Sequence, residues 1–119
     1  MRFSFITLYV KNMEKSLAFY QGLLGLKVQH QMAMGDSEFV FLGEDGQPTI
    51  ELIASPSHQN NTYTGFSVGI AVNSLPKATA LLQANGHKLL RGPISPTPQT
   101  SFSFFEGPDG EEIELIEQR

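Results

Sequence analysis

The chain has 119 residues, 40% of them hydrophobic, and its eight Lys and Arg against twelve Asp and Glu give a formal net charge of −4. This length supports one compact core, whereas two independent domains of about 55 residues each would be marginal. The chain has no cysteine, which excludes disulfides and thiolate metal sites. It has no apolar run of the roughly 20 residues that span a membrane and no basic run typical of nucleic-acid binding. We therefore expect a cytoplasmic protein.

The first half of the chain predicts one strand, one helix and three further strands. Side chains alternate in polarity before Asn12, a typical helix N-cap, and apolar residues then follow at helical spacing until Gly25, a typical C-cap. The expected elements are a strand at 3–10, a helix from Asn12 to Gly25, and strands at 26–34, 38–42 and 49–53. The polar segment 55–64 has no periodicity and is expected to connect the two halves.

The second half repeats this order. Ser74 is the expected N-cap of a helix that has Pro76 in its first turn and ends at Gly86. Strands are expected at 66–72, 87–91, 100–105 and 111–117. The segment 92–99 contains three prolines, which are incompatible with a regular central strand, so it is expected to form a loop, either at an edge or over the mouth of a cleft.

Corresponding residues in the two halves indicate an internal repeat. Asp45–Ile53 returns as 109–116, one residue shorter, Gly25 corresponds to Gly86, and Val10 corresponds to Val72. A period of this size indicates that duplication organises the fold. We therefore predict a single α+β domain made of tandem β-α-β-β-β modules, residues 1–54 and 65–119, with function sought in the cleft between them.

Two motifs resemble those of the vicinal oxygen chelate superfamily. They are the run 8–20, Leu-Tyr-Val-Lys-Asn-Met-Glu-Lys-Ser-Leu-Ala-Phe-Tyr, continued by Leu-Leu-Gly-Leu at 23–26, and the turn Gly-Pro-Asp-Gly at 107–110 before Ile-Glu-Leu at 113–115. The superfamily includes glyoxalases, bleomycin resistance proteins and extradiol dioxygenases. The resemblance implies that each module's strands curl into an incomplete barrel with the helices outside, and that a small molecule binds inside the curve, frequently in a homodimer.

The resemblance also implies four positions for metal ligands, which are Phe5, Glu51, Ser67 and Glu114 in this chain. Phenylalanine has no lone pair to donate, and a serine hydroxyl is a poor ligand beside imidazole or carboxylate. The three histidines, His30, His58 and His87, fall away from these positions. We therefore expect no cofactor, although a divalent metal remains possible through a shifted register or a ligand from a second subunit.

Strand periodicity predicts which side chains line the cleft. The predicted ligand-binding residues are Phe5, Thr7, Tyr9, Phe39, Phe41, Glu51, Ser67, Phe102, Phe104 and Glu114. Two carboxylates that converge on an apolar cleft require a proton, a cation, a hydrogen-bond donor or water. The aromatic rings suit a flat or cationic ligand, but they are equally compatible with packing within each hairpin. His58 is expected to be solvated in the connection.

These features favour a small-molecule-binding protein of the glyoxalase/bleomycin resistance type, without the usual metal centre, for an apolar and possibly cationic ligand. The alternative is an enzyme, either a lyase or isomerase resembling lactoylglutathione lyase, in which Glu51 or Glu114 removes a proton next to a carbonyl, or a dioxygenase. A metal enzyme would require a register shift that brings His30 or His87 to the site.

Overall fold

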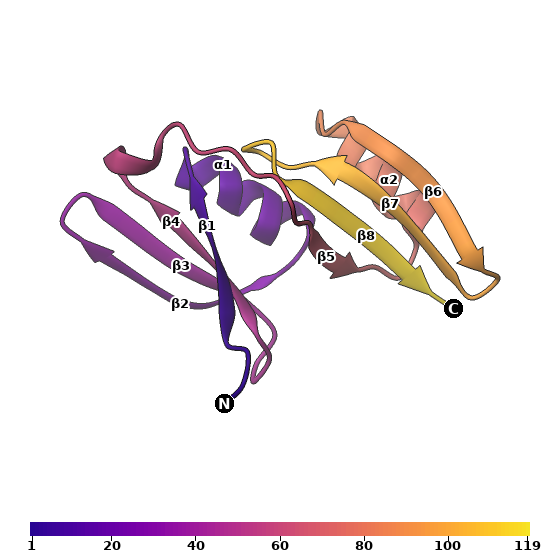
Figure 1. The fold of residues 1–119 in the computed structure, drawn as a ribbon, viewed down its shortest axis with the longest axis horizontal. Coiled ribbons are helices and arrows are strands. Elements are labelled where there is room, and N and C mark those ends of the chain that lie inside the picture. Colours follow the sequence, from indigo (N-terminus) through magenta and orange to yellow (C-terminus); the bar gives the residue numbers. More distant parts are fainter. The chain divides into compact units, whose positions relative to one another are not determined.

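The computed structural model describes residues 1–119, which divide into two compact units, Met1–Asn61 and Thr62–Arg119. Each unit contains its own four-stranded sheet and its own helix, so the predicted α+β class and the tandem modules are confirmed (Figure 1). Neither sheet closes into a barrel, since each has two edge strands. No helix is long and apolar enough to cross a membrane.

The first unit has the sheet order β1-β4-β3-β2, in which β1 runs parallel to β4 and the other pairs are antiparallel. Its elements are β1 (Phe5–Val10), α1 (Met13–Leu17), the π-helical turn η1 (Ala18–Leu23), β2 (Lys27–Met34), β3 (Ser37–Gly43), β4 (Thr49–Ala54) and the short 3₁₀ turn η2 (Pro56–His58). The first strand begins at Phe5, two residues later than predicted.

The predicted first helix is not α-helical throughout. Asn12 caps it as expected, because the side-chain oxygen Oδ1 accepts a hydrogen bond from the Lys15 backbone N–H at 3.0 Å. From Ala18 the α-helix changes to a π-helical turn, in which the neighbouring rings of Phe19 and Tyr20 are both buried and lie edge to face. Gly25, with φ of 73°, ends the helix in the conformation that favours glycine.

The second unit repeats this arrangement with the sheet order β5-β8-β7-β6, again with the first strand parallel to the last. Its elements are β5 (Val68–Ala71), α2 (Leu75–Ala84), β6 (Leu89–Thr97), β7 (Thr100–Glu106) and β8 (Glu112–Gln118). Ser74 caps α2 as predicted, its hydroxyl oxygen accepting a hydrogen bond from the Lys77 backbone N–H at 3.3 Å.

The expectation of a loop at 92–99 is wrong. Residues up to Thr97 belong to β6, which pairs with β7 through a register that shifts three times between Leu89 and Thr97. Because β6 is an edge strand, one side of its backbone has no partner strand, and a proline without an N–H is tolerated there. The prolines therefore make β6 a bent and irregular edge strand, but they do not prevent this segment from forming a strand.

Alternation along the strands divides each sheet into a covered and an uncovered face. Figure 1 shows α1 against one face of the first sheet and α2 against one face of the second, in agreement with their contacts to β4 and β8. The buried apolar side chains between helix and sheet include Leu8, Val10, Val40, Leu42 and Leu52 in the first unit, and Phe105, Ile113 and Leu115 of the sheet with Leu82 of α2 in the second. The intervening residues of each strand face the other side, where the predicted site residues lie.

Candidate ligand-binding faces

A hydrogen-bonded pair lies in the middle of the uncovered face of the first sheet. The parallel register sets Thr7 of β1 beside Glu51 of β4, and the Thr7 hydroxyl donates a hydrogen bond to Glu51 Oε1 at 2.6 Å. Both side chains are half-buried. One of the two predicted carboxylates is thus matched by a hydrogen-bond donor from the neighbouring strand.

Aromatic rings flank this pair on both sides. The ring of Phe5 meets that of Phe41 edge to face, with centroids 5.3 Å apart, and the imidazole of His30 lies 6.2 Å from the same Phe41 ring. On the other side, the rings of Tyr9 and His58 lie 4.0 Å apart. The expectation that His58 is solvated in the connection is wrong, because the turn η2 brings it against Tyr9 and leaves it half-buried.

Phe39 has a different environment from Phe41. It is aligned with Ile53 of β4 and lines a cavity of about 400 Å³ on the β2–β3 hairpin together with Met32 and Gln31. Met32 is 46% exposed, so a flexible apolar side chain that solvent reaches borders this cavity. Phe41 therefore contacts another predicted site residue, Phe5, whereas Phe39 belongs to the hairpin.

The second unit presents the equivalent carboxylate without its donor. Glu114 of β8 is aligned with Gly69 of β5, so a glycine stands where Thr7 stands in the first unit. Glu114 is half-buried and makes no side-chain hydrogen bond or ion pair. A Cβ at Gly69 would contact nothing within 4 Å, so there is open space beside the carboxylate. Ser67 precedes β5 and is exposed.

An arginine not anticipated from the sequence lies on the same face of the second sheet. Phe104 is aligned with Glu114 and meets Phe102 edge to face at 5.8 Å. The Arg91 guanidinium lies 4.0 Å from the Phe104 ring centroid and forms an ion pair with Glu112. Only the shifted register of β6 places Arg91 opposite Phe104, and single-sequence periodicity carries no signal for such a shift.

The residues present do not fit the divalent-metal centre that the resemblance implies. Phe5 has no donor atom and Ser67 offers only an exposed hydroxyl, so two of the four implied positions lack an imidazole or a carboxylate. Neither unit brings together three or more His, Asp or Glu side chains in an arrangement that could hold a metal ion. His87 lies elsewhere, with Nδ1 3.1 Å from the Glu106 carbonyl oxygen.

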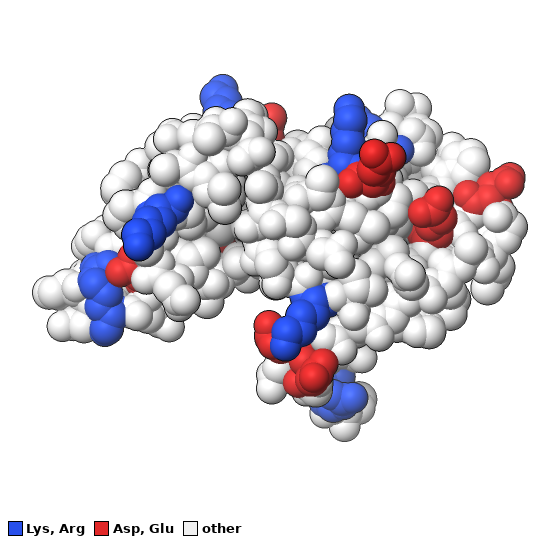
Figure 2. Space-filling model, turned by 180° about the vertical axis from the view of Figure 1, so that it is seen from behind, with Lys and Arg blue, Asp and Glu red and all other residues white.

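On the face drawn in Figure 2, acidic and basic groups are scattered over a mostly uncharged surface, with several groups of opposite sign close together. Lys27 and Glu44 form a largely exposed ion pair at 3.7 Å. Such pairs contribute little to stability, and this face carries no extended patch of one sign.

Comparison with known sequences identifies similar proteins along the whole chain. The sequence model described as "Glyoxalase/Bleomycin resistance protein/Dioxygenase superfamily" matches residues 2–115. A Neisseria meningitidis protein named "Lactoylglutathione lyase" is 30% identical over 100% of this chain and 92% of its own length. An Arabidopsis thaliana protein named "Probable lactoylglutathione lyase, chloroplastic" is 32% identical over 92% of this chain, which spans 33% of that relative.

Solved structures with the same fold include both an enzyme and a binding protein. The trypanothione-dependent glyoxalase I of Leishmania major superposes with a TM-score of 0.84 at 22% identity, covering 98% of this chain and 86% of that one. TnmS3, an antibiotic-binding protein from Streptomyces, superposes with a TM-score of 0.71 at 20% identity, covering 100% and 97%. At these identities the likeness concerns the fold alone.

Proposed function

Because the chain belongs to the glyoxalase/bleomycin resistance protein/dioxygenase superfamily, we propose that it binds a small, largely apolar molecule without the metal centre that the family resemblance implies. The ligand lies on the uncovered sheet faces that carry the aromatic residues and the two carboxylates. As part of the same proposal, the protein is a cytoplasmic homodimer. Size-exclusion chromatography with light scattering tests the dimer separately from the ligand.

The observation that carries this proposal is the group formed by Phe5, Thr7 and Glu51. At the first ligand position of the family, the Phe5 ring packs against Phe41 and offers no lone pair. At the second, the Glu51 carboxylate is held by the Thr7 hydroxyl at 2.6 Å. Apolar rings around a hydrogen-bonded polar group are typical of a small-molecule site, in which the rings supply contact area and the polar group fixes orientation.

Glu114 supports a ligand with a positively charged group. Its carboxylate is half-buried, has no partner and lies beside the open space at Gly69. Phe104 is aligned with it, but the Arg91 guanidinium already lies 4.0 Å from the centroid of that ring, so the carboxylate is the group that an incoming cation would meet. A screen of flat aromatic cations by thermal shift is therefore expected to find ligands whose effect is reduced more by Glu114→Gln than by Glu51→Gln.

Metal binding is the direct test of the proposal. Protein purified without chelator is expected to contain far less than one transition-metal ion per chain, and its thermal midpoint should not respond selectively to a series of divalent metals. A specific site filled at a hundred times its dissociation constant stabilises the native state by about 2.7 kcal/mol, so a selective rise of the midpoint with one metal would reveal such a site. Stoichiometric metal in the wild type contradicts the proposal.

A second candidate function is supported by the 30% identity with the Neisseria meningitidis lactoylglutathione lyase, which extends over the whole chain. In this alternative the free carboxylate of Glu114, or that of Glu51, removes the proton next to a carbonyl. The assay follows formation of lactoylglutathione from methylglyoxal and glutathione, with and without divalent metals. Turnover that Glu114→Gln or Glu51→Gln abolishes, while the fold is retained, favours the enzyme, and an inactive wild type favours the binding protein.

A further inference from the structure

A groove of about 460 Å³ lies in the second unit, between the first turns of α2 and the edge strand β6. Its lining residues are Leu75, Pro76, Thr79, Pro93, Ser95, Ser101, Glu117 and Arg119. Ser101 is buried and alternates with Phe102 along β7, so the groove opens on the helix-covered face of the sheet, opposite to Phe102 and Phe104. It is therefore separate from the faces assigned to the proposed function.

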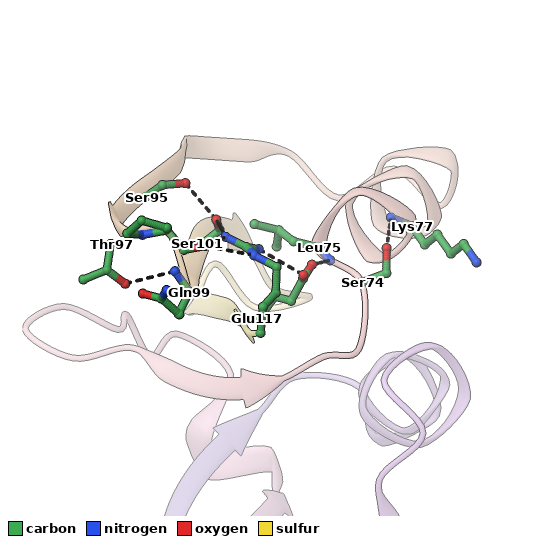
Figure 3. Close-up of polar contacts among 10 residues, drawn as sticks. Ser74, Leu75, Lys77, Ser95, Thr97, Gln99, Ser101 and Glu117 are labelled. Atoms are coloured by element: carbon green, nitrogen blue, oxygen red, sulfur yellow. Dashed lines mark hydrogen bonds and ion pairs between the residues drawn. The ribbon is translucent and has the colours of Figure 1, made fainter.

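The charged end of the groove is internally neutralised. Glu117 Oε1 accepts a hydrogen bond from the Leu75 backbone N–H at 2.6 Å, and Oε2 pairs with Arg119 Nη1 at 3.0 Å, as part of the network in Figure 3. The remaining donors of Arg119 reach the Pro98 carbonyl oxygen and the Ser101 hydroxyl. The Glu117 carboxylate thus binds both the Arg119 guanidinium and an N–H at the start of α2. Because the two charges neutralise each other, neither attracts an ion.

The serine pair on the floor retains one unused hydrogen. Ser95 and Ser101 lie 2.7 Å apart between their hydroxyl oxygens, and this bond uses one of their two hydroxyl hydrogens (Figure 3). Ser101 also accepts from Arg119, so whichever serine donates to the other, one hydroxyl hydrogen remains for an acceptor. Thr79 on the opposite wall has a hydroxyl with no partner within the protein. The polar groups available to a ligand are therefore neutral hydrogen-bond donors.

We propose that this groove is a second binding site, for an uncharged and mostly apolar small molecule that carries a hydrogen-bond acceptor such as a carbonyl oxygen. The volume lies in the range of about 300–1,000 Å³ typical of small-molecule sites. The two prolines and Leu75 supply apolar walls, and the Ser95–Ser101 pair orients the acceptor. A charged ligand would lose its hydration without gaining a counter-charge, because Glu117 and Arg119 are already paired.

Nile red, an uncharged dye with a carbonyl acceptor, is a suitable probe, and its fluorescence is titrated with the full chain. The wild type is expected to bind one dye per chain at this site. Thr79→Trp, which fills the groove, should weaken binding more than tenfold. Leu81→Trp introduces the same residue at a 43% exposed position on the other side of α2 and should leave binding unchanged. Ser95→Phe, which fills the groove from the exposed edge strand β6, should also weaken binding more than tenfold.

The outcomes separate this site from the aromatic faces. The proposal is overturned if the wild type gives no saturable signal, if a folded Thr79→Trp variant binds as the wild type does, or if Phe41→Ala abolishes dye binding while Thr79→Trp does not. If Thr79→Trp fails to fold, the exposed position of Ser95 makes Ser95→Phe the deciding variant, and unchanged affinity there overturns the proposal. None of these results depends on the ligand of the proposed function.

Discussion

Replacing Thr7 with Val is expected to destabilise the protein by about 1–2 kcal/mol. Valine keeps the shape of threonine but removes the hydroxyl that donates to Glu51 Oε1 at 2.6 Å. Hydrogen bonds to charged groups contribute about 1.5–3 kcal/mol, and loss of the donor leaves the acceptor unsatisfied. Because both side chains are only half-buried, water replaces part of the lost bond, which favours the lower part of that range.

The measurement is urea and thermal unfolding followed by circular dichroism. For a chain of 119 residues, this loss corresponds to a fall in the thermal midpoint of about 3–8 °C. A double-mutant cycle with Glu51→Gln isolates the part of the interaction that depends on the carboxylate charge, since the glutamine carbonyl oxygen still accepts a hydrogen bond, and we expect a coupling energy of at least about 0.5 kcal/mol. Thr7→Ser retains the hydroxyl and should restore most of the stability.

The second unit supplies the matched control. Glu114 has Gly69 in place of a threonine and makes no side-chain bond, so Glu114→Gln removes no donor–acceptor pair. It is expected to change the free energy of unfolding by less than about 0.5 kcal/mol. The reasoning is refuted if Thr7→Val is as stable as the wild type, if the cycle shows no coupling, or if Thr7→Ser behaves like the valine variant.

Two further predictions concern α2. The hydrogen bond from the Leu75 N–H, and then Arg119, hold the pKa of Glu117 below its ordinary value of 4.5, so its contribution to stability is complete above pH 4.5 and is lost as the pH falls through the folded-state pKa. The thermal midpoint of Glu117→Gln should therefore lie below that of the wild type at pH 7, and the two should converge as the pH falls below 4.5, whereas a constant gap would contradict this role. Leu82→Ala, at a fully buried position, should lower the free energy of chemical unfolding by about 2–5 kcal/mol. Leu81→Ala, at a 43% exposed position, should lower it by less than about 1 kcal/mol. Equal losses would contradict the assigned packing of the helix.

The repeat and the alternation of side chains were sufficient to predict most of the architecture. Val10 and Leu8 lie beneath the helix and Thr7 lies on the other face, as a period of two requires. Asn12 and Ser74 both cap helices through their side chains. These features depend on local stereochemistry and on burial of one face, and both leave regular patterns in a sequence.

Features that depend on the position of a strand within the sheet were not predictable. The prolines of β6 indicate only that a central strand is unfavourable, because a sequence does not state which strand will occupy an edge. The change from α-helix to π-helix at Ala18 leaves the apolar spacing nearly intact, so the pattern predicts one regular helix. Both departures appear only when neighbouring elements are in place.

The candidate sites also combine features that the sequence predicts with features that it does not. Placing Thr7 and Glu51 on one face needed only parity, but their hydrogen bond depends on the parallel register of β1 and β4. The contact of His58 with Tyr9 depends on the turn η2. The groove beside α2 was missed because its floor consists of small hydroxyl residues, Ser95 and Ser101, which have no distinctive spacing in the sequence.

The prolines of β6 also bear on unwanted association between chains. An exposed sheet edge offers a row of N–H and C=O groups to any passing strand. Pro93 and Pro96 have no N–H to offer, and the shifted register makes the edge irregular. The equivalent edge strand of the first unit, β2, contains no proline and is mostly exposed. Of the two hairpin edges, β2 is therefore expected to be the more prone to templated strand addition at high protein concentration, and a proline or lysine introduced there should reduce aggregation.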